Sequence, residues 1–438
     1  MSGVEADAAA HAHAEGAARR SYGKLVAVLA ARTRDLAGAE DALADAFAAA
    51  LVEWPARGVP ANAEAWLLTV ARRRLVDAWR RQRQGEQASA HLALLDQLAE
   101  PQASGGLPDR RLELLFACAH PAIDHGVRAP LMLQTVLGFD AATIASAFLI
   151  APAAMGQRLV RAKARILQAG IGLELPVRAQ LPERLDAVLE AIYAAYAEGW
   201  VDAEGADPRR RNLADEAIWL GRLIVALLPQ EPEALGLLAL MLHAHARRAA
   251  RRDAAGDYVP LDQQDTALWD RALIAEAEEL LRRAGGFGRA GRFQLEAAVQ
   301  SAHCARRHGG RADWGAIVTL YDALHALTGS PVAALNRAVA LAEQGGPACA
   351  LAALDELAGD ARLADYQPYW AARADLLGRT GDRAAAVAAY ARAIGLESDP
   401  AVRRFLQRRC AVLVATPAQA GTTGSEPRRQ AGANASRR

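Results

Sequence analysis

The chain has 438 residues, of which 52% are hydrophobic and 23% are charged, and its formal net charge is +1 at pH 7. This length exceeds what one hydrophobic core organises, so we expect two to four domains of an ordinary globular protein. The near-neutral charge gives no global argument for nucleic-acid binding, which therefore has to rest on local basic patches.

The cysteines and the hydropathy pattern exclude several further classes. The four cysteines are far apart and show no paired spacing: Cys118, Cys304, Cys349 and Cys410. This pattern argues against a disulfide framework and a zinc site, and it fits a reducing cytoplasm. No apolar run approaches the length of a membrane span, and residues 1–20 lack the apolar core of a signal peptide. We expect a cytoplasmic protein with no cofactor, no metal and no membrane contact.

The periodicity predicts an all-α fold. Nearly every periodic segment has helical spacing, and alternating strand patterns are absent. Stretches rich in Gly, Pro and polar residues divide the chain into a disordered leader at 1–19, a helical domain at 20–84, a linker at 85–109, a second helical domain at 110–172, a helical repeat extension at 177–414 and a disordered tail at 415–438.

The first helical domain is expected to contain an amphipathic, acidic helix at 35–54. Its apolar side would consist of Leu36, Leu43, Phe47 and Leu51. Its polar side would carry Glu40, Asp41 and Asp45, an acidic strip suited to a basic protein surface.

The next helix, within 62–84, mixes aromatic and basic residues. It carries six arginines against two acids. Arginine binds phosphate and an aromatic ring can stack on an unpaired base, so this mixture suits a partly melted DNA strand. The alternative is that Trp66 and Trp79 are core residues and the arginines are solvated. For Trp66, which is flanked by apolar residues, we favour the core interpretation.

The second domain contains a predicted helix-turn-helix at 138–167. Asp140 is a suitable N-cap, and Pro152 fits the first position of the second helix. That helix would bury Met155, Leu159, Ala162 and Ile166 and expose Gln157, Arg158, Arg161 and Arg165 toward phosphates and base edges. Alternatively, this is an ordinary helical hairpin with a solvated arginine face, and the hairpin alone leaves DNA binding at even odds.

The extension is predicted to contain tandem helical hairpins at 331–400. The clearest unit has a helix, a turn at 378–382 and a second helix, and it resembles a tetratricopeptide repeat. Small residues at Ala374, Gly378 and Ala389 would let paired helices approach closely.

Two other patterns are set aside. Residues 286–291, GFGRAG, match a dinucleotide-binding pattern, but they follow a helical segment rather than a strand, so we interpret them as an inter-helix loop. His243 and His245 lie two residues apart without further ligands, which disfavours a metal site. No catalytic motif is present, and we expect no enzyme.

The order of these motifs resembles a bacterial RNA polymerase sigma factor of the extracytoplasmic-function class. The resemblance rests on the acidic helix, the segment WLLTVARRRLVDAW, the segment LELLFACAHPAI at 112–123 and the ending QRLVRAK of the helix-turn-helix. It continues through 177–414 as a subgroup with a long helical C-terminal extension. The domains at 20–84 and 110–172 would then be sigma domains two and four.

The resemblance implies two partners, core polymerase and promoter DNA, and a role for each motif. Glu40, Asp41 and Asp45 would bind core polymerase. The minus-ten element would be contacted by Arg72, Arg74, Asp77, Arg80 and Arg81, and the minus-thirty-five element by Gln157, Arg158, Arg161, Lys163 and Arg165. Two positions depart from the family: Arg73 replaces a common asparagine, which puts base preference in doubt, and Thr143 replaces a frequent glutamate.

Two other functions stay open at the level of sequence. One is an operator-binding regulator that uses the helix-turn-helix and binds protein partners through its repeats, although it leaves the acidic helix unexplained. The other is a repeat scaffold with purely structural N-terminal helices. For the extension, we expect protein contacts that control when the factor is active, against the alternative of a passive appendage.

Overall fold

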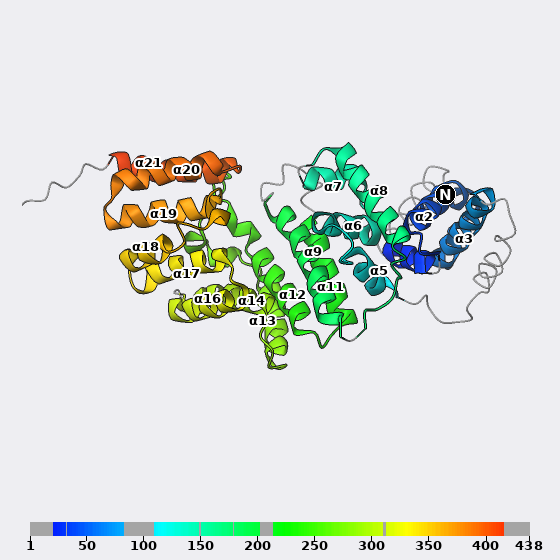
Figure 1. Ribbon diagram of the computed structural model, residues 1–438, viewed down its shortest axis with the longest axis horizontal. Helices are drawn as coiled ribbons and strands as arrows, with labels where there is room; N and C mark the ends of the chain where they lie inside the picture. The colour runs from blue at the N-terminus through cyan, green and yellow to red at the C-terminus, as the bar shows by residue number, and fades with distance from the viewer. Residues whose placement is uncertain are drawn as a thin grey trace, which may run out of the picture. The chain divides into compact units, whose positions relative to one another are not determined.

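The computed structural model describes residues 21–31, 33–82, 109–148, 150–177, 179–201, 213–309 and 312–415. The described part contains helices and no β-strand, which confirms the all-α prediction. The chain forms two compact units (Figure 1). Unit 1 comprises Met1–Asp253 and Val259–Gly329, and unit 2 comprises Ala254–Tyr258 and Ser330–Arg438. The predicted leader, most of the predicted linker and nearly all of the predicted tail lie outside the described residues.

The described part of unit 1 begins with the helical residues 21–31 and continues through two groups of helices. The first group is α2 (Leu36–Arg57), α3 (Ala63–Gln82), α5 (Arg111–Cys118), α6 (His125–Leu137), α7 (Ala141–Ala147) and α8 (Pro152–Gln168). The second is α9 (Leu181–Val201), α11 (Leu213–Leu227), α12 (Pro232–Ala246), α13 (Arg271–Gly285), α14 (Arg292–Cys304), α15 (Arg306–Gly309) and α16 (Trp314–Thr328). Three 3₁₀ turns lie between α12 and α13: Arg248–Arg251, Leu261–Gln263 and Thr266–Leu268.

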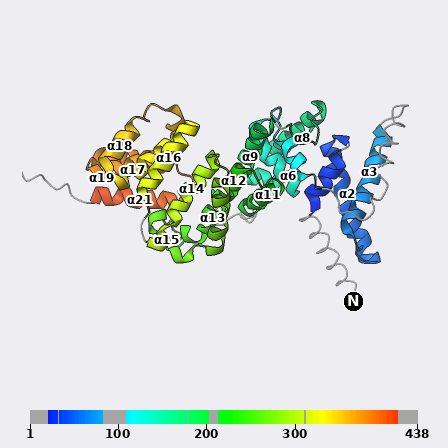
Figure 2. The same cartoon turned by 90° about the horizontal axis from the view of Figure 1, so that it is seen from below.

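Within unit 1, helices α5–α8 lie between the α2–α3 pair and the α9–α11 pair (Figures 1 and 2). One continuous hydrophobic core extends from Leu25 through α5–α8 and α9–α12 to Phe293 and Ala297 on α14. The first half of the region after residue 177 therefore shares its core with the N-terminal helices, and its removal would expose apolar surface.

Unit 2 stacks successive helices. These are α17 (Pro331–Gln344), α18 (Pro347–Asp355), a 3₁₀ turn at Ala361–Leu363, α19 (Gln367–Thr380), α20 (Arg383–Leu396) and α21 (Pro400–Ala415). One core lies among α17, α18 and α19, and a second among α19, α20 and α21. Ala374 and Ala389 are buried where α19 meets α20, and a Cβ added to Gly378 would lie 3.3 Å from Leu413. Small residues therefore do allow close helix packing here.

Aspartates begin many of the helices. The side chains of Asp35, Asp140 and Asp382 each accept hydrogen bonds from backbone N–H groups in the first turn of α2, α7 and α20 respectively. Such caps satisfy amide groups that have no partner inside the helix, each contributing about 1 kcal/mol. Gly138 ends α6 in the left-handed conformation, with φ of 75°, which glycine adopts without steric cost.

Candidate functional site

The acidic residues predicted for the polar side of α2 do not share one environment. Asp41 and Asp45 are exposed, as expected. Glu40 is only 8% exposed, so its placement on a solvent-facing strip was wrong. The physical reason is a partner distant in sequence: the Nζ of Lys163, on α8, donates a hydrogen bond to Glu40 Oε2.

The Glu40–Lys163 ion pair is largely withdrawn from water. The side chains of Glu40 and Lys163 are 10% and 11% exposed. Burial raises the pKa of Glu40, and the neighbouring Lys163 ammonium opposes this rise. Removing one partner of such a pair leaves an uncompensated buried charge, which commonly costs about 3–5 kcal/mol. The pair joins α2 to α8 tightly for as long as both side chains are present.

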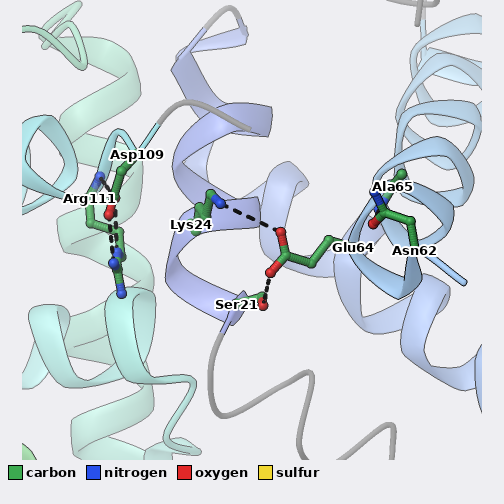
Figure 3. Close-up of polar contacts among 7 residues, drawn as sticks. All are labelled: Ser21, Lys24, Asn62, Glu64, Ala65, Asp109 and Arg111. Carbon is green, nitrogen blue, oxygen red and sulfur yellow. Dashed lines mark hydrogen bonds and ion pairs between the residues drawn. The ribbon is translucent and has the colours of Figure 1, made fainter. Parts of the chain in front are cut away.

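The α3 helix begins with a polar junction to the helical residues 21–31 (Figure 3). Ser21 Oγ donates a 2.5 Å hydrogen bond to Glu64 Oε1, and Lys24 Nζ lies 3.5 Å from Glu64 Oε2. Asn62 caps α3 by accepting a hydrogen bond from the Ala65 backbone N–H. These contacts hold the start of α3, the helix that carries Arg72 and Arg74.

The basic part of α3 presents a mostly exposed face. Arg74, Asp77 and Arg73 are exposed, and Arg72 is half-buried. The side chains of Arg80 and Arg81, which were also predicted to bind DNA, lie outside the described residues.

The two tryptophans at the junction of α2 and α3 pack against one another. Trp54 is buried and Trp66 half-buried, with ring centroids 5.5 Å apart in an edge-to-face arrangement. This packing agrees with the core interpretation of Trp66.

Helices α7 and α8 form the predicted pair, with residues 148–151 between them. Asp140 accepts hydrogen bonds from the backbone N–H groups of Ala142 and Thr143, and Pro152 occupies the first turn of α8. The predicted seam is buried: Met155, Leu159, Ala162 and Ile166. The surface near the N-terminus of α8 is electropositive, because the helix dipole is positive at that end and α8 contains no acidic residue.

The opposite face of α8 is exposed and basic. Its exposed polar members are Gln157, Arg158, Arg161, Arg165 and Gln168. Arg161 donates a 3.3 Å hydrogen bond to Gln157 Oε1, one helical turn away. Lys163 does not belong to this face, because its side chain is only 11% exposed and pairs with Glu40. Three arginines therefore remain on the face, in an arrangement that can meet phosphates and base edges.

The α9–α11 pair supports α5 and α6 directly. Arg184 on α9 donates a 2.5 Å hydrogen bond to the Phe116 carbonyl oxygen at the end of α5. On α6, His125 Nε2 lies 3.4 Å from Glu190 Oε2 of α9. These contacts, together with the shared core, make α9 part of the platform that holds α7 and α8.

The helical residues 21–31 and α6 lie in close contact, which we did not predict from the sequence. A Cβ added to Gly23 would overlap the carbonyl oxygen of Val136, and one added to Gly138 would lie 3.1 Å from the Tyr22 ring. A signal was available, since glycine inside a helix costs about 1 kcal/mol relative to alanine and often marks close packing. The sequence could not show which helix approaches it.

Residues 286–291 connect α13 to α14, as expected for an inter-helix loop. Among the described residues, no three His, Cys, Asp or Glu side chains gather as a metal-ligand set. Within the same residues, no helix combines the length and apolarity required to cross a membrane.

Comparisons with known proteins place this geometry in context. Residues 18–85 match the Sigma-70 region 2 family, and residues 184–285 match a family of unknown function, DUF6596. The uncharacterized protein R00370 of Rhizobium meliloti (strain 1021) is 39% identical over 391 residues, which cover 88% of this chain and 92% of that protein. No solved structure matches significantly. The chain therefore belongs to the same family as this Rhizobium protein, and the match of residues 18–85 to Sigma-70 region 2 supports a sigma factor.

Proposed function

We propose that the protein is a sigma factor of the extracytoplasmic-function class, which binds core RNA polymerase and directs promoter recognition. The observation that carries this proposal is the combination of a Sigma-70 region 2 at 18–85 with a second, basic helical pair, α7–α8, in the same compact unit. A sigma factor must bridge two promoter elements, and region 2 alone supplies one DNA-binding surface. Polymerase performs the chemistry, so the factor itself needs no catalytic residue.

In this proposal Asp41 and Asp45 form the main contact with polymerase, because both are exposed on α2. Arg72, Arg74, Asp77, Arg80 and Arg81 contact the minus-ten element. The helix-turn-helix α7–α8 contacts the minus-thirty-five element through Gln157, Arg158, Arg161 and Arg165. Lys163 and Glu40 are available to DNA and polymerase only when their ion pair opens. We place sigma domain two at 20–84 and sigma domain four at 110–172.

The extension consists of two parts with different roles. Helices α9–α14 share the core of unit 1 and hold α5 and α6 in place. Unit 2, with its stacked tetratricopeptide-like hairpins, offers the surface for a protein partner that regulates activity. Transcription driven by a chain ending at Gly329 tests this division, because the cut falls at the boundary of the two units. Unaltered transcription by that chain, in cells and with purified polymerase, would reject the regulatory role of unit 2.

Run-off transcription with purified core polymerase tests the proposed function as a whole. A sigma factor confers promoter-specific starts by itself. An operator-binding regulator alters starts only when another sigma factor is present, and a scaffold does neither.

A further inference from the structure

Unit 2 contains five residues that come from a distant part of the sequence. Ala254–Tyr258 lie between α12 and α13 along the chain, yet they belong to unit 2 in space. They form the tip of a tight loop, because the Val259 N–H donates a 2.9 Å hydrogen bond to the Arg251 carbonyl oxygen and Gly256 turns the chain with φ of 77°. We refer to Ala254–Tyr258 as the inserted segment.

The inserted segment is held on α21 by charge and by an aromatic contact. Asp257 accepts a 3.0 Å hydrogen bond from Arg404 Nε and a 2.7 Å hydrogen bond from Arg408 Nη1. The hydrogen bond from Arg404 lowers the pKa of the Asp257 carboxyl, which is therefore charged at neutral pH. The Tyr258 ring meets the Phe405 ring edge to face, with centroids 5.4 Å apart. Helix α21 thus binds an acidic residue followed directly by an aromatic one.

The composition of α21 suits an acidic partner beyond this segment. The helix carries four arginines and no acid. Arg403 and Arg409 donate hydrogen bonds to acceptors within unit 2. Arg404 and Arg408 lie one helical turn apart, and their side chains remain 48% and 52% exposed beside Asp257. Ion pairs this exposed contribute little to stability and are screened by salt, so another carboxylate can take the place of Asp257.

We propose that Arg404, Phe405 and Arg408 form a docking site for a partner protein that presents an acidic residue followed directly by an aromatic residue, and that the inserted segment fills this site until the partner displaces it. The proposal rests on the proposed function, since it gives the regulatory partner of unit 2 a place and a chemistry. Further acidic side chains on the partner gain from the positive charge of α21. The inserted segment competes as a tethered ligand, at an effective concentration on the order of millimolar.

Release of the inserted segment is measured with chymotrypsin, which cleaves after Tyr258, in the full-length chain. Asp257→Lys places a third cation beside Arg404 and Arg408, so the segment leaves α21. Cleavage after Tyr258 should then be roughly fivefold faster, because proteolysis follows the population of the open form. The matched control is Glu356→Lys, the same charge change at an exposed acid of unit 2. Equal cleavage rates for wild type and Asp257→Lys overturn the proposal.

Docking is measured with a synthetic peptide of residues 252–260, RDAAGDYVP, in which photoreactive benzoylphenylalanine replaces the tyrosine. Light joins the bound peptide covalently to the protein, and mass spectrometry locates the attachment, so weak binding is recorded. Because the tethered segment no longer competes, labelling of α21 should rise roughly threefold or more from wild type to Asp257→Lys. A peptide with lysine in place of the aspartate should not label α21. Absence of labelling in Asp257→Lys, or equal labelling by both peptides, overturns the proposal.

The arginines are tested one at a time in the Asp257→Lys chain. Arg404→Glu and Arg408→Glu should each abolish labelling, because a carboxylate there repels the aspartate of the peptide. Arg403→Glu, on the same helix, is the matched control and should keep it, since Arg403 donates to a backbone carbonyl oxygen of unit 2. Labelling that survives at both Arg404→Glu and Arg408→Glu rejects the docking site. These measurements use no polymerase, so they decide the docking site even if the protein fails to direct transcription, which would reject only the proposed function.

Discussion

The Arg111 guanidinium lies 5.2 Å from the ring centroid of Trp219, a cation–π contact that joins the start of α5 to α11. It is accompanied by the Arg184 hydrogen bond to the end of α5 and by apolar side chains of α9 in the shared core. The helices that carry the proposed DNA-binding pair are thus supported by helices that a minimal sigma factor does not need. A truncation that removes α9 and α11 therefore also removes the support for α5.

We predict that a chain ending at Gly172 is severely destabilised, whereas one ending at Gly329 folds cooperatively. The shorter chain loses Leu185, Val188 and Leu189, which α9 buries in the core. Each fully buried side chain of this kind stabilises the fold by about 1.5–3 kcal/mol. The stability of both truncated chains is measured by thermal unfolding, which is monitored by circular dichroism. A sharp, wild-type-like transition for the chain ending at Gly172 would show that α9 is dispensable.

Charge reversal at both Asp41 and Asp45 should weaken core polymerase binding without unfolding the protein. Both side chains are exposed on α2, so lysine is accommodated there, but a basic partner surface is then repelled. The control is Glu53→Lys, a partly exposed acid farther along the same helix whose surface pair with Arg57 contributes little. The double variant changes the net charge twice as much as the control, so a control that loses half as much binding free energy as the double variant would attribute the effect to net charge alone.

Arg158→Ala and Arg161→Ala should lower promoter affinity, by about 1–3 kcal/mol where the arginine reads guanine through two hydrogen bonds. A base-reading arginine also relaxes specificity at one position, whereas a phosphate-binding one weakens all sequences and flattens the salt dependence. Binding is measured by fluorescence anisotropy over a salt series. Arg282→Ala, on α13, serves as the charge control. Wild-type promoter affinity in both α8 variants would refute the recognition-helix assignment.

Unit 1 should lose stability on mild acidification because of His243. This side chain is fully buried on α12, and burial, together with the cations of Arg247 and Arg307, lowers its pKa to about 4. The unfolded chain takes up a proton near pH 6.5, so stability is complete above that pH and falls as the pH decreases toward 4. The loss between pH 7 and pH 5 is about 2 kcal/mol.

Urea unfolding of wild type and His243→Leu at these two pH values isolates this contribution. At neutral pH His243 is uncharged, so its 3.5 Å approach to Glu278 is not an ion pair there, and leucine removes no charge. The variant should lose about 2 kcal/mol less than wild type on acidification. The exposed His325 on α16, replaced in the same way, provides the comparison. Identical pH dependence of wild type and His243→Leu would contradict the assignment.

Local features of the fold were predictable because their causes are local. The Asp140 cap, Pro152 at the start of α8 and the seam through Met155 follow from residues within a few positions of each other. The buried face of α2 was harder to predict. Its buried face uses alanines such as Ala46 and Ala50, so Leu51, predicted to be buried, is 39% exposed. Alanine scarcely distinguishes one helix face from another.

The exposed residues of the candidate site were predictable from the sequence, but the contacts between its helices were not. The exposure of Asp41, Asp45 and Arg158 follows from helical periodicity. The burial of Glu40 does not, because its cause is Lys163, on a helix 123 residues later in the chain. The same holds for Gly23, whose helical position indicated close packing but not the backbone of α6 as its neighbour.

The most direct measurement is run-off transcription with purified core polymerase, the full-length chain and a library of promoter fragments. We predict that the protein alone, added to core polymerase, produces discrete starts on a defined subset of fragments. Charge reversal at Asp41 and Asp45 should abolish these starts by preventing holoenzyme formation, and Arg158→Ala should reduce them by weakening promoter binding. Starts that appear only when a different sigma factor is supplied would contradict the central claim.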